Sequence, residues 1–274
     1  MPADALLEVR DLKKSFALAG RLLHRAEGDE IPPPDGATVG VDGVSFSLAS
    51  GETLGIVGES GCGKTTLARI LLRLIEPDSG EMRFCGQDWR SARGGQLRAL
   101  RRRIQMVFQD PVASLNARMR VGSIVGEPLA IHEPRLSRAD RHARAAQAVE
   151  AVGLGADALE RFPHEFSGGQ RQRIGIARAL ILRPELVVAD EPVSALDVSV
   201  GAQILDLLDR LRRELSLTLI LISHSLPVVA QLATRVSVMQ AGKFVESGPA
   251  DQVLRAPQHP YTQALIAAVP EIPA

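Results

Sequence analysis

"ETLGIVGESGCGKTT", residues 52–66, is the most informative stretch of this sequence. Its first part is apolar and predicts a strand that leads directly into the glycine-rich segment Gly58–Thr65. That segment fits the pattern G-x-x-x-x-G-K-[ST], and apolar side chains at helical spacing over residues 67–74 predict a helix after it. Strand, glycine loop and helix in this order predict a phosphate-binding loop within an α/β protein.

Each part of this loop has a chemical role in holding a nucleotide. Glycines let backbone N–H groups turn toward the β-phosphate, and the start of the helix adds partial positive charge. Lys64 can reach the β- and γ-phosphate oxygens, and the Thr65 hydroxyl can ligate Mg²⁺. The residues expected to contact the nucleotide here are Gly58, Glu59, Ser60, Gly61, Cys62, Gly63, Lys64, Thr65 and Thr66.

Polar side chains at the ends of three apolar runs could complete the chemistry. Asp190 ends the run "LVVAD" and is expected beside the metal, while Glu191 is suited to polarise an attacking water. Gln109 in "MVFQDP" is expected to contact the γ-phosphate and a Mg²⁺-bound water, and His224 could hydrogen-bond the γ-phosphate. Read singly, these residues could instead be a surface acidic pair, a polar turn residue and a structural histidine.

A second glycine pair occurs in "FSGGQRQR", residues 166–173, just before another predicted helix. Ser167, Gly168, Gly169 and Gln170 could present a hydroxyl and N–H groups to an anion, or could simply form a tight turn. One nucleotide needs only one cradle for its β-phosphate. We therefore expect this segment to act on a nucleotide bound by another copy of the chain or by a paralogue.

The rest of the sequence indicates one α/β core with additions. Residues 5–12 predict an edge strand, and residues 20–40, rich in glycine, proline and charge, indicate a surface insertion or mobile loop. Residues 97–179 have helical spacing without β-branched runs, which predicts a mostly helical lobe inserted into the core. Strands and helices then alternate, which implies a largely parallel sheet, and residues 235–248 predict a hairpin.

Composition narrows the possible partners and compartment. The formal net charge is +0, so no polyanion is expected, although the arginine-dense residues 97–105 could be either a solvated helix face or a lipid or nucleic-acid contact. Two cysteines without metal or disulfide spacing fit a reducing compartment. Without a signal peptide or an apolar run of membrane-spanning length, we expect a cytosolic protein unless a partner tethers it.

Taken together, these elements resemble the ATP-binding-cassette ATPases. The loop at 58–65 looks like the Walker A motif, "LVVADE" like Walker B and "FSGGQ" like the signature, while Gln109, "SALD" (194–197) and His224 stand in the family order. The resemblance implies ATP and Mg²⁺ as ligands, with two cassettes that pair head to tail. It also places Phe16 where an aromatic ring stacks on adenine, whereas Phe166 and Ser225 depart from the usual leucine and acidic residue.

The implied fold is a P-loop NTPase (RecA-like) α/β core with an N-terminal antiparallel β subdomain and an inserted α-helical lobe. The implied domains are a nucleotide-binding domain over residues 1–254, with its lobe at about 97–179, and a C-terminal importer-type extension over 255–274. The tail "APQHPYTQALIAAVP" (256–270) would otherwise read as a capped amphipathic helix.

A narrower similarity is to the ATPase subunits of oligopeptide, dipeptide and nickel importers. It is carried by residues 107–129, 189–200 and the tail 256–270, which lacks the cysteine cluster of some such subunits. It implies an ATPase at the cytoplasmic face of the membrane, working with a second cassette (itself or a paralogue), two permease subunits and, indirectly, an external binding protein, without nucleic acid. The alternative is a soluble cassette ATPase of the iron–sulfur assembly or repair type.

Overall fold

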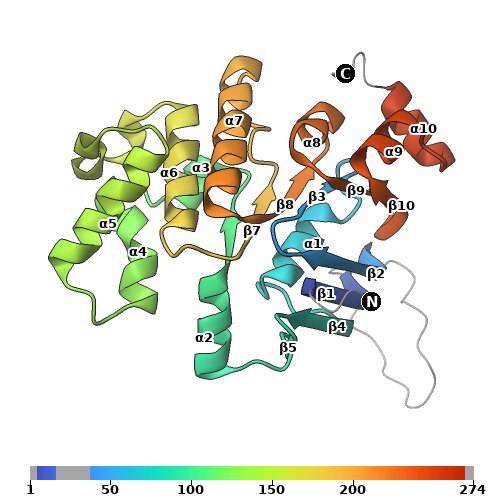
Figure 1. The fold of residues 1–274 in the computed structure, drawn as a ribbon, viewed down its shortest axis with the longest axis horizontal. Coiled ribbons are helices and arrows are strands. Elements are labelled where there is room, and N and C mark those ends of the chain that lie inside the picture. The colour runs from blue at the N-terminus through green and yellow to red at the C-terminus, as the bar shows by residue number, and fades with distance from the viewer. Residues whose placement is uncertain (1–4, 17–37, 269–274) are drawn as a thin grey trace, which may run out of the picture.

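The computed structural model describes residues 5–16 and 38–268, which form two sheets and a set of surrounding helices (Figure 1). The smaller sheet is antiparallel, with strand order β2-β1-β4-β5. Its strands are β1 (Ala5–Phe16), β2 (Thr38–Ala49), β4 (Ser79–Phe84) and β5 (Gln87–Asp88). The strand predicted at residues 5–12 exists, but the prediction that it lies at an edge is wrong, since β1 pairs with both β2 and β4.

The larger sheet has six strands in the order β10-β9-β3-β8-β7-β6. All neighbours from β9 to β6 are parallel, and the predicted hairpin of β9 and β10 adds one antiparallel pair at the edge. The strands are β3 (Thr53–Val57), β6 (Ile104–Val107), β7 (Leu186–Asp190), β8 (Thr218–Ser223), β9 (Arg235–Gln240) and β10 (Lys243–Pro249). Every residue of β3, β7 and β8 is buried, as expected for parallel strands covered on both faces.

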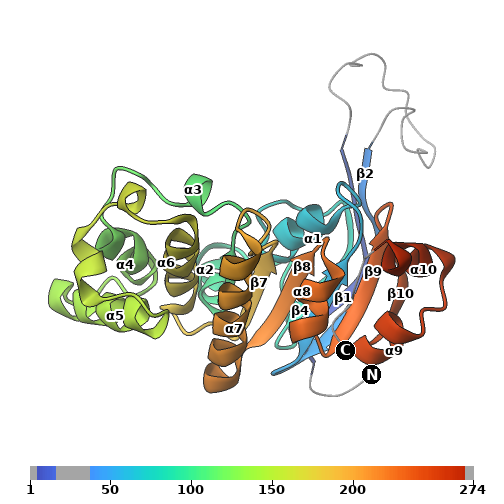
Figure 2. The same ribbon diagram turned by 90° about the horizontal axis from the view of Figure 1, so that it is seen from above.

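Helices from the middle of the chain gather at one end of the molecule (Figures 1 and 2). This group holds α3 (Pro111–Ser114), α4 (Val121–His132), α5 (Arg138–Ala151), the short 3-10 helices η1 (Ala156–Glu160) and η2 (Pro163–Glu165), and α6 (Gly168–Leu180). The range 97–179 predicted for a helical lobe therefore contains one strand of the core, β6. This strand has only four residues, so it is hard to recognise in the sequence among helices.

The other helices are α1 (Lys64–Leu71), α2 (Gly94–Arg103), α7 (Val198–Leu215), α8 (Leu226–Leu232), α9 (Ala250–Arg255) and α10 (Pro260–Ala267). Helix α1 ends earlier than its apolar pattern predicts, so Leu74 lies beyond it with 55% of its surface exposed. The predicted insertion at residues 20–40 lies mostly outside the described residues.

Two apolar clusters cover the two faces of the large sheet. One cluster joins alternate residues of its strands, such as Ile56 and Ile220, to Leu67 of α1 and to the antiparallel sheet. The other joins the opposite residues of these strands to α6, α7, α8 and the helical group. Helix α1 is thus held between the two sheets, which fixes the loop that precedes it.

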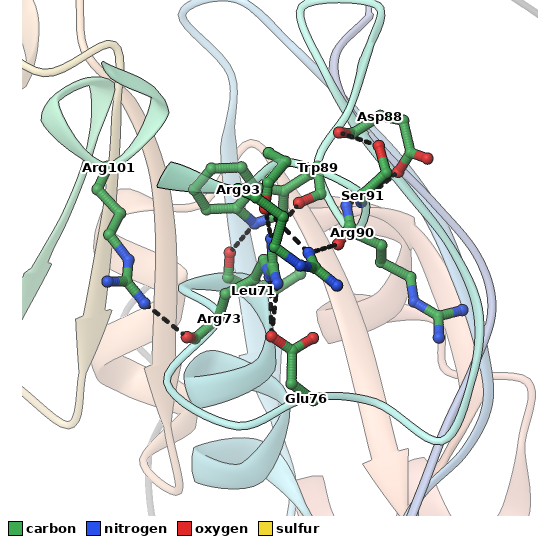
Figure 3. Close-up of polar contacts among 10 residues, drawn as sticks. Leu71, Arg73, Glu76, Asp88, Trp89, Arg90, Ser91, Arg93 and Arg101 are labelled. Carbon is green, nitrogen blue, oxygen red and sulfur yellow. Dashed lines mark hydrogen bonds and ion pairs between the residues drawn. The ribbon is translucent and has the colours of Figure 1, made fainter. Parts of the chain in front are cut away.

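Buried polar contacts also anchor the end of α1 (Figure 3). The indole N–H of Trp89 donates to the Leu71 carbonyl at 2.7 Å, which satisfies one of the open carbonyls at the helix end. Arg73 is 5% exposed and donates to the carbonyls of Trp89 and Ala92 at 3.0 and 2.7 Å, while its other nitrogens contact Glu76. These bonds join the helix that follows the glycine loop to the segment after β5.

Replacing Arg73 with Met is expected to lower the free energy of unfolding by about 2–4 kcal/mol, because the Trp89 carbonyl loses its Arg73 donor and the Ala92 carbonyl keeps only its bond from Arg93. Urea denaturation of the purified protein measures this change. Arg83→Met, which removes an exposed arginine from β4, is the matched control and is expected to change stability by about 0.5 kcal/mol or less. Equal stability of the two variants would show that the Arg73 contacts do not hold the fold.

Candidate nucleotide-binding site

A cleft of about 590 Å³ lies at the carboxyl ends of the parallel strands, where ligands bind in open α/β sheets. The cleft is lined by the glycine loop and by residues of β1 and β2. Residues that follow β6, β7 and β8 complete its lining. Its lining residues are Phe16, Val39, Gly40, Ser60, Gly61, Gly63, Lys64, Thr65, Thr66, Gln109, Glu191, Ser194, Ala195 and His224. The cleft thus brings six of the nine predicted loop residues together with Phe16, Gln109, Glu191 and His224, whereas Gly58, Glu59 and Cys62 do not line it.

The glycine loop is folded around the Lys64 side chain. The Lys64 ammonium donates to the carbonyls of Gly58 and Glu59 at 2.7 and 2.8 Å and is 4% exposed. Gly63 precedes α1 with φ of 112°, and a β-carbon on it would lie 2.0 Å from the Gly40 carbonyl oxygen. Only glycine fits this position, and it lets the loop approach β2 closely.

Thr65, in the first turn of α1, and Asp190, at the end of β7, lie in contact with each other. The Thr65 hydroxyl lies 3.3 Å from a carboxylate oxygen of Asp190, which is 2% exposed. Burial raises the pKa of Asp190, and the hydroxyl of Thr65 opposes this effect. Thr65 and Asp190 also line a second cleft together with Gln109. Mg²⁺ prefers oxygen ligands, so the hydroxyl of Thr65 and the carboxylate of Asp190 fit this ion.

Glu191 and His224 form a hydrogen-bonded pair at the ends of neighbouring strands. His224 Nδ1 lies 2.8 Å from Oε2 of Glu191, whose side chain is mostly buried. The backbone of Glu191 is left-handed, with φ of 45°, and its N–H donates to the Ile222 carbonyl at 2.9 Å. The turn after β7 therefore aims this carboxylate at the cleft, in contact with the imidazole.

Phe16 and Gln109 also line the cleft. Phe16 is 39% exposed and pairs with Thr38 at the end of the β1–β2 ladder, so strand pairing holds it beside the loop. Gln109 follows β6 and lines both this cleft and a second cleft next to the helical group. The two predicted positions are compatible with contacts to a bound nucleotide.

The signature segment lies elsewhere. Within the described part of the chain, none of its four residues Ser167–Gln170 lines the cleft. Ser167 begins α6 in a capping box, in which its hydroxyl accepts from the Gln170 N–H and its N–H donates to the Gln170 side chain. A β-carbon on Gly169 would lie 2.4 Å from Val200, so close packing of α6 on α7 requires this glycine. The segment is thus held by its capping box and by α7, and it does not line the cleft of the chain's own glycine loop.

Comparison with known proteins supports this interpretation of the geometry. The family model described as "ABC transporter" matches residues 41–194, more than half of the chain. The chain belongs to the ABC transporter family. A second model, the C-terminal region of oligopeptide/dipeptide transporters, matches residues 245–274.

The relatives agree with both models. This ABC cassette is 50% identical to the oligopeptide transport ATP-binding protein AppF of Bacillus subtilis, over 97% of this chain and 79% of that one. It is 49% identical to the oligopeptide transport ATP-binding protein OppF of Salmonella typhimurium, over 97% and 78% of the two chains. The family predicted from the sequence is confirmed.

Solved structures confirm the predicted P-loop NTPase fold class. A dimeric post-hydrolysis state of the ATP-binding cassette MJ0796, bound to ADP and Pi, gives a TM-score of 0.74 with 26% identity over 89% of this chain and 98% of that one. The cassette cbiO1 from Clostridium perfringens gives 0.76 with 26% identity over 92% of each chain. This ABC cassette is therefore an ATPase module of the kind that binds ATP.

Two further findings concern the membrane and the tail. Across residues 5–16 and 38–268, no helix is both long and apolar enough to cross a bilayer.

Sequence reasoning missed Tyr261, whose hydroxyl lies 3.2 Å from the Glu59 backbone nitrogen in the glycine loop. The available signal was that the chain has a single tyrosine, placed in the tail.

Proposed function

We propose that this chain is the ATP-hydrolysing subunit of a binding-protein-dependent membrane importer for peptides or related small solutes. The observation that carries the proposal is the separation of the signature segment from a cleft that is lined by the glycine loop, Glu191 and His224. Asp190 lies next to that cleft, in contact with Thr65. A second cassette, identical or paralogous, would place its signature segment over this cleft. ATP would then be bound between the two cassettes.

The cleft residues divide the work of binding and hydrolysis. Loop N–H groups and Lys64 would hold the phosphates, and Phe16 would stack on the adenine. Thr65 and Asp190 would hold Mg²⁺, with Gln109 on its bound water, and the ion would supply positive charge beside the β- and γ-phosphates.

Glu191 would accept a proton from the attacking water, and this requires its carboxylate to be ionised and aimed at the cleft. The contact with His224 fixes the orientation of that carboxylate at 2.8 Å. His224 is half exposed, so its other ring nitrogen is free to face the γ-phosphate or the second cassette.

A second cleft would carry the closing motion to the membrane. Its volume is about 710 Å³, and it lies where the core meets α3 and α4, with exposed Phe108 and Ile131 in its lining. Gln109 and Thr65 line this cleft as well as the nucleotide cleft, so the two clefts adjoin. We propose that a permease subunit docks there and that ATP shifts the population of cassette pairs from open to closed.

The relatives support the choice of cargo and location. They are oligopeptide transport ATP-binding proteins, together with a glutathione import ATP-binding protein of Pectobacterium atrosepticum that is 46% identical over 98% of this chain and 42% of that one. We accordingly place the protein at the cytoplasmic face of the membrane, held there by two permease subunits, with an external binding protein delivering the solute. The soluble iron–sulfur assembly or repair alternative has no support among these relatives.

Affinity purification of the tagged chain from solubilised membranes tests the proposal. The expected result is a complex with two permease subunits and a second cassette, whose ATPase rate in liposomes rises when a peptide-loaded binding protein is added. Lys64→Ala serves as the control, because it should retain the complex and lose the ATPase activity. Isolation of the wild-type chain only in permease-free soluble complexes would contradict the importer function.

A further inference from the structure

The C-terminal tail touches the glycine loop directly. Helix α10 carries Tyr261, whose hydroxyl accepts a hydrogen bond from the Glu59 N–H at 3.2 Å, across 202 positions of sequence. The ring is half-buried and packs against the apolar cluster on the α7–α8 side of the large sheet, together with Leu265 and Ile266. This contact links the region matched by the C-terminal transporter model to the phosphate-binding loop.

The "HPYT" residues aim this hydroxyl. The Glu246 carboxylate of β10 accepts from the N–H groups of Gln258 and His259 at 2.8 and 3.1 Å, which fixes the turn before α10. His259 then caps the helix, because its Nδ1 accepts from the Tyr261 N–H at 3.2 Å, and Pro260 occupies the first helical position. These bonds fix the orientation of the first turn of α10, which carries Tyr261.

The peptide unit between Gly58 and Glu59 is held at both edges. Its carbonyl accepts from the Lys64 ammonium at 2.7 Å, and its N–H donates to Tyr261. Rotation of this peptide would break both bonds. A bound phosphate competes with the loop carbonyls for the donors of Lys64, whereas the bond to Tyr261 lies outside that competition.

We propose that Tyr261 is a positioning residue for ATP, through which the C-terminal extension holds the glycine loop in its phosphate-binding conformation. The inference rests on the proposed ATP site. A loop that is already ordered loses less conformational entropy when it binds the nucleotide, so the tail raises the affinity for ATP. The turnover number at saturating ATP depends on Glu191 and the second cassette, so Tyr261 affects the affinity for ATP and not this rate.

Tyr261→Phe tests this role, because it removes one hydroxyl and keeps the packed ring. Amide hydrogen exchange at Glu59, measured in the nucleotide-free protein, is expected to become about 3- to 10-fold faster. The Kd for MgATP, measured with a fluorescent ATP analogue, is expected to rise about 3- to 10-fold, with the turnover number at saturation within about two-fold.

Ser247→Ala is the matched control, since that hydroxyl contacts Ser237 at 2.9 Å and not the loop. It is expected to leave both the exchange rate at Glu59 and the Kd unchanged. Unchanged exchange or an unchanged Kd in Tyr261→Phe would overturn the positioning role. Failure of the wild-type chain to bind ATP would instead defeat the proposed function, and the exchange measurement separates the two cases because it needs no nucleotide.

Discussion

Replacing Glu191 with Gln is expected to lower the turnover number for ATP by about 100-fold or more while leaving ATP binding intact. The reason is chemical, because an amide has nearly the shape of a carboxylate but cannot accept the proton of the attacking water. The neighbouring His224 can still hydrogen-bond the amide oxygen, so the turn after β7 is expected to keep its geometry. The affinity for ATP depends on the glycine loop and is expected to change by about two-fold or less.

Phosphate release by the complete complex measures the turnover number, and equilibrium binding of a fluorescent ATP analogue measures affinity. The matched control is Glu185→Gln, which changes a glutamate beside the opposite end of β7 whose partner is Arg103. That variant is expected to hydrolyse ATP at a rate within about two-fold of the wild type. Turnover of Glu191→Gln at the wild-type level would show that another group is the base.

Replacing Ser167 with Arg is expected to abolish ATP hydrolysis, by about 100-fold or more, and to leave binding at the chain's own Lys64 site unchanged. The long cationic side chain would project from the start of α6 into the space that a partner's nucleotide must occupy. The chain's own cleft is not lined by Ser167, so its affinity for ATP is expected to stay within about two-fold.

The same substitution also removes a helix cap, worth about 1 kcal/mol, so a control must separate stability from function. Ser137→Arg provides one, because Ser137 caps α5 by accepting from the Asp140 N–H at 3.1 Å in the same group of helices. It is expected to cost similar stability and to keep the ATPase activity. Loss of ATP binding in Ser167→Arg, or loss of activity in both variants, would contradict action on a partner's nucleotide.

The parts of the fold that depend on local pattern could be predicted from the sequence. The apolar runs at 53–57, 186–190 and 218–223 form buried parallel strands, because strands covered on both faces are typically near-continuous runs of β-branched and aliphatic residues. The position of β1 inside its sheet could not be predicted, since its second partner is β4, some seventy residues later. The apolar spacing also did not show that α1 ends before Leu74, where the backbone of Arg73 is left-handed, with φ of 50°, and Trp89 bonds the Leu71 carbonyl.

The candidate site divides in the same way. The glycine loop and the residues that end strands are predictable, because carboxyl ends of parallel strands meet at one edge of a sheet. The sequence could not show that His224 contacts Glu191 instead of acting alone, since the contact depends on a left-handed turn at Glu191. The contact of Tyr261 with the glycine loop could not be predicted from the sequence for a similar reason, because only the folded tail brings the two together.

We propose that ATP joins this cassette to a second one, and sedimentation of Glu191→Gln with and without MgATP, alone and mixed with a candidate paralogous cassette, measures this pairing. ATP is expected to convert single cassettes into pairs in at least one of these samples, and adding Ser167→Arg to both chains is expected to prevent the conversion. Saturating ATP binding with no increase in mass in either sample would show that ATP does not join two cassettes.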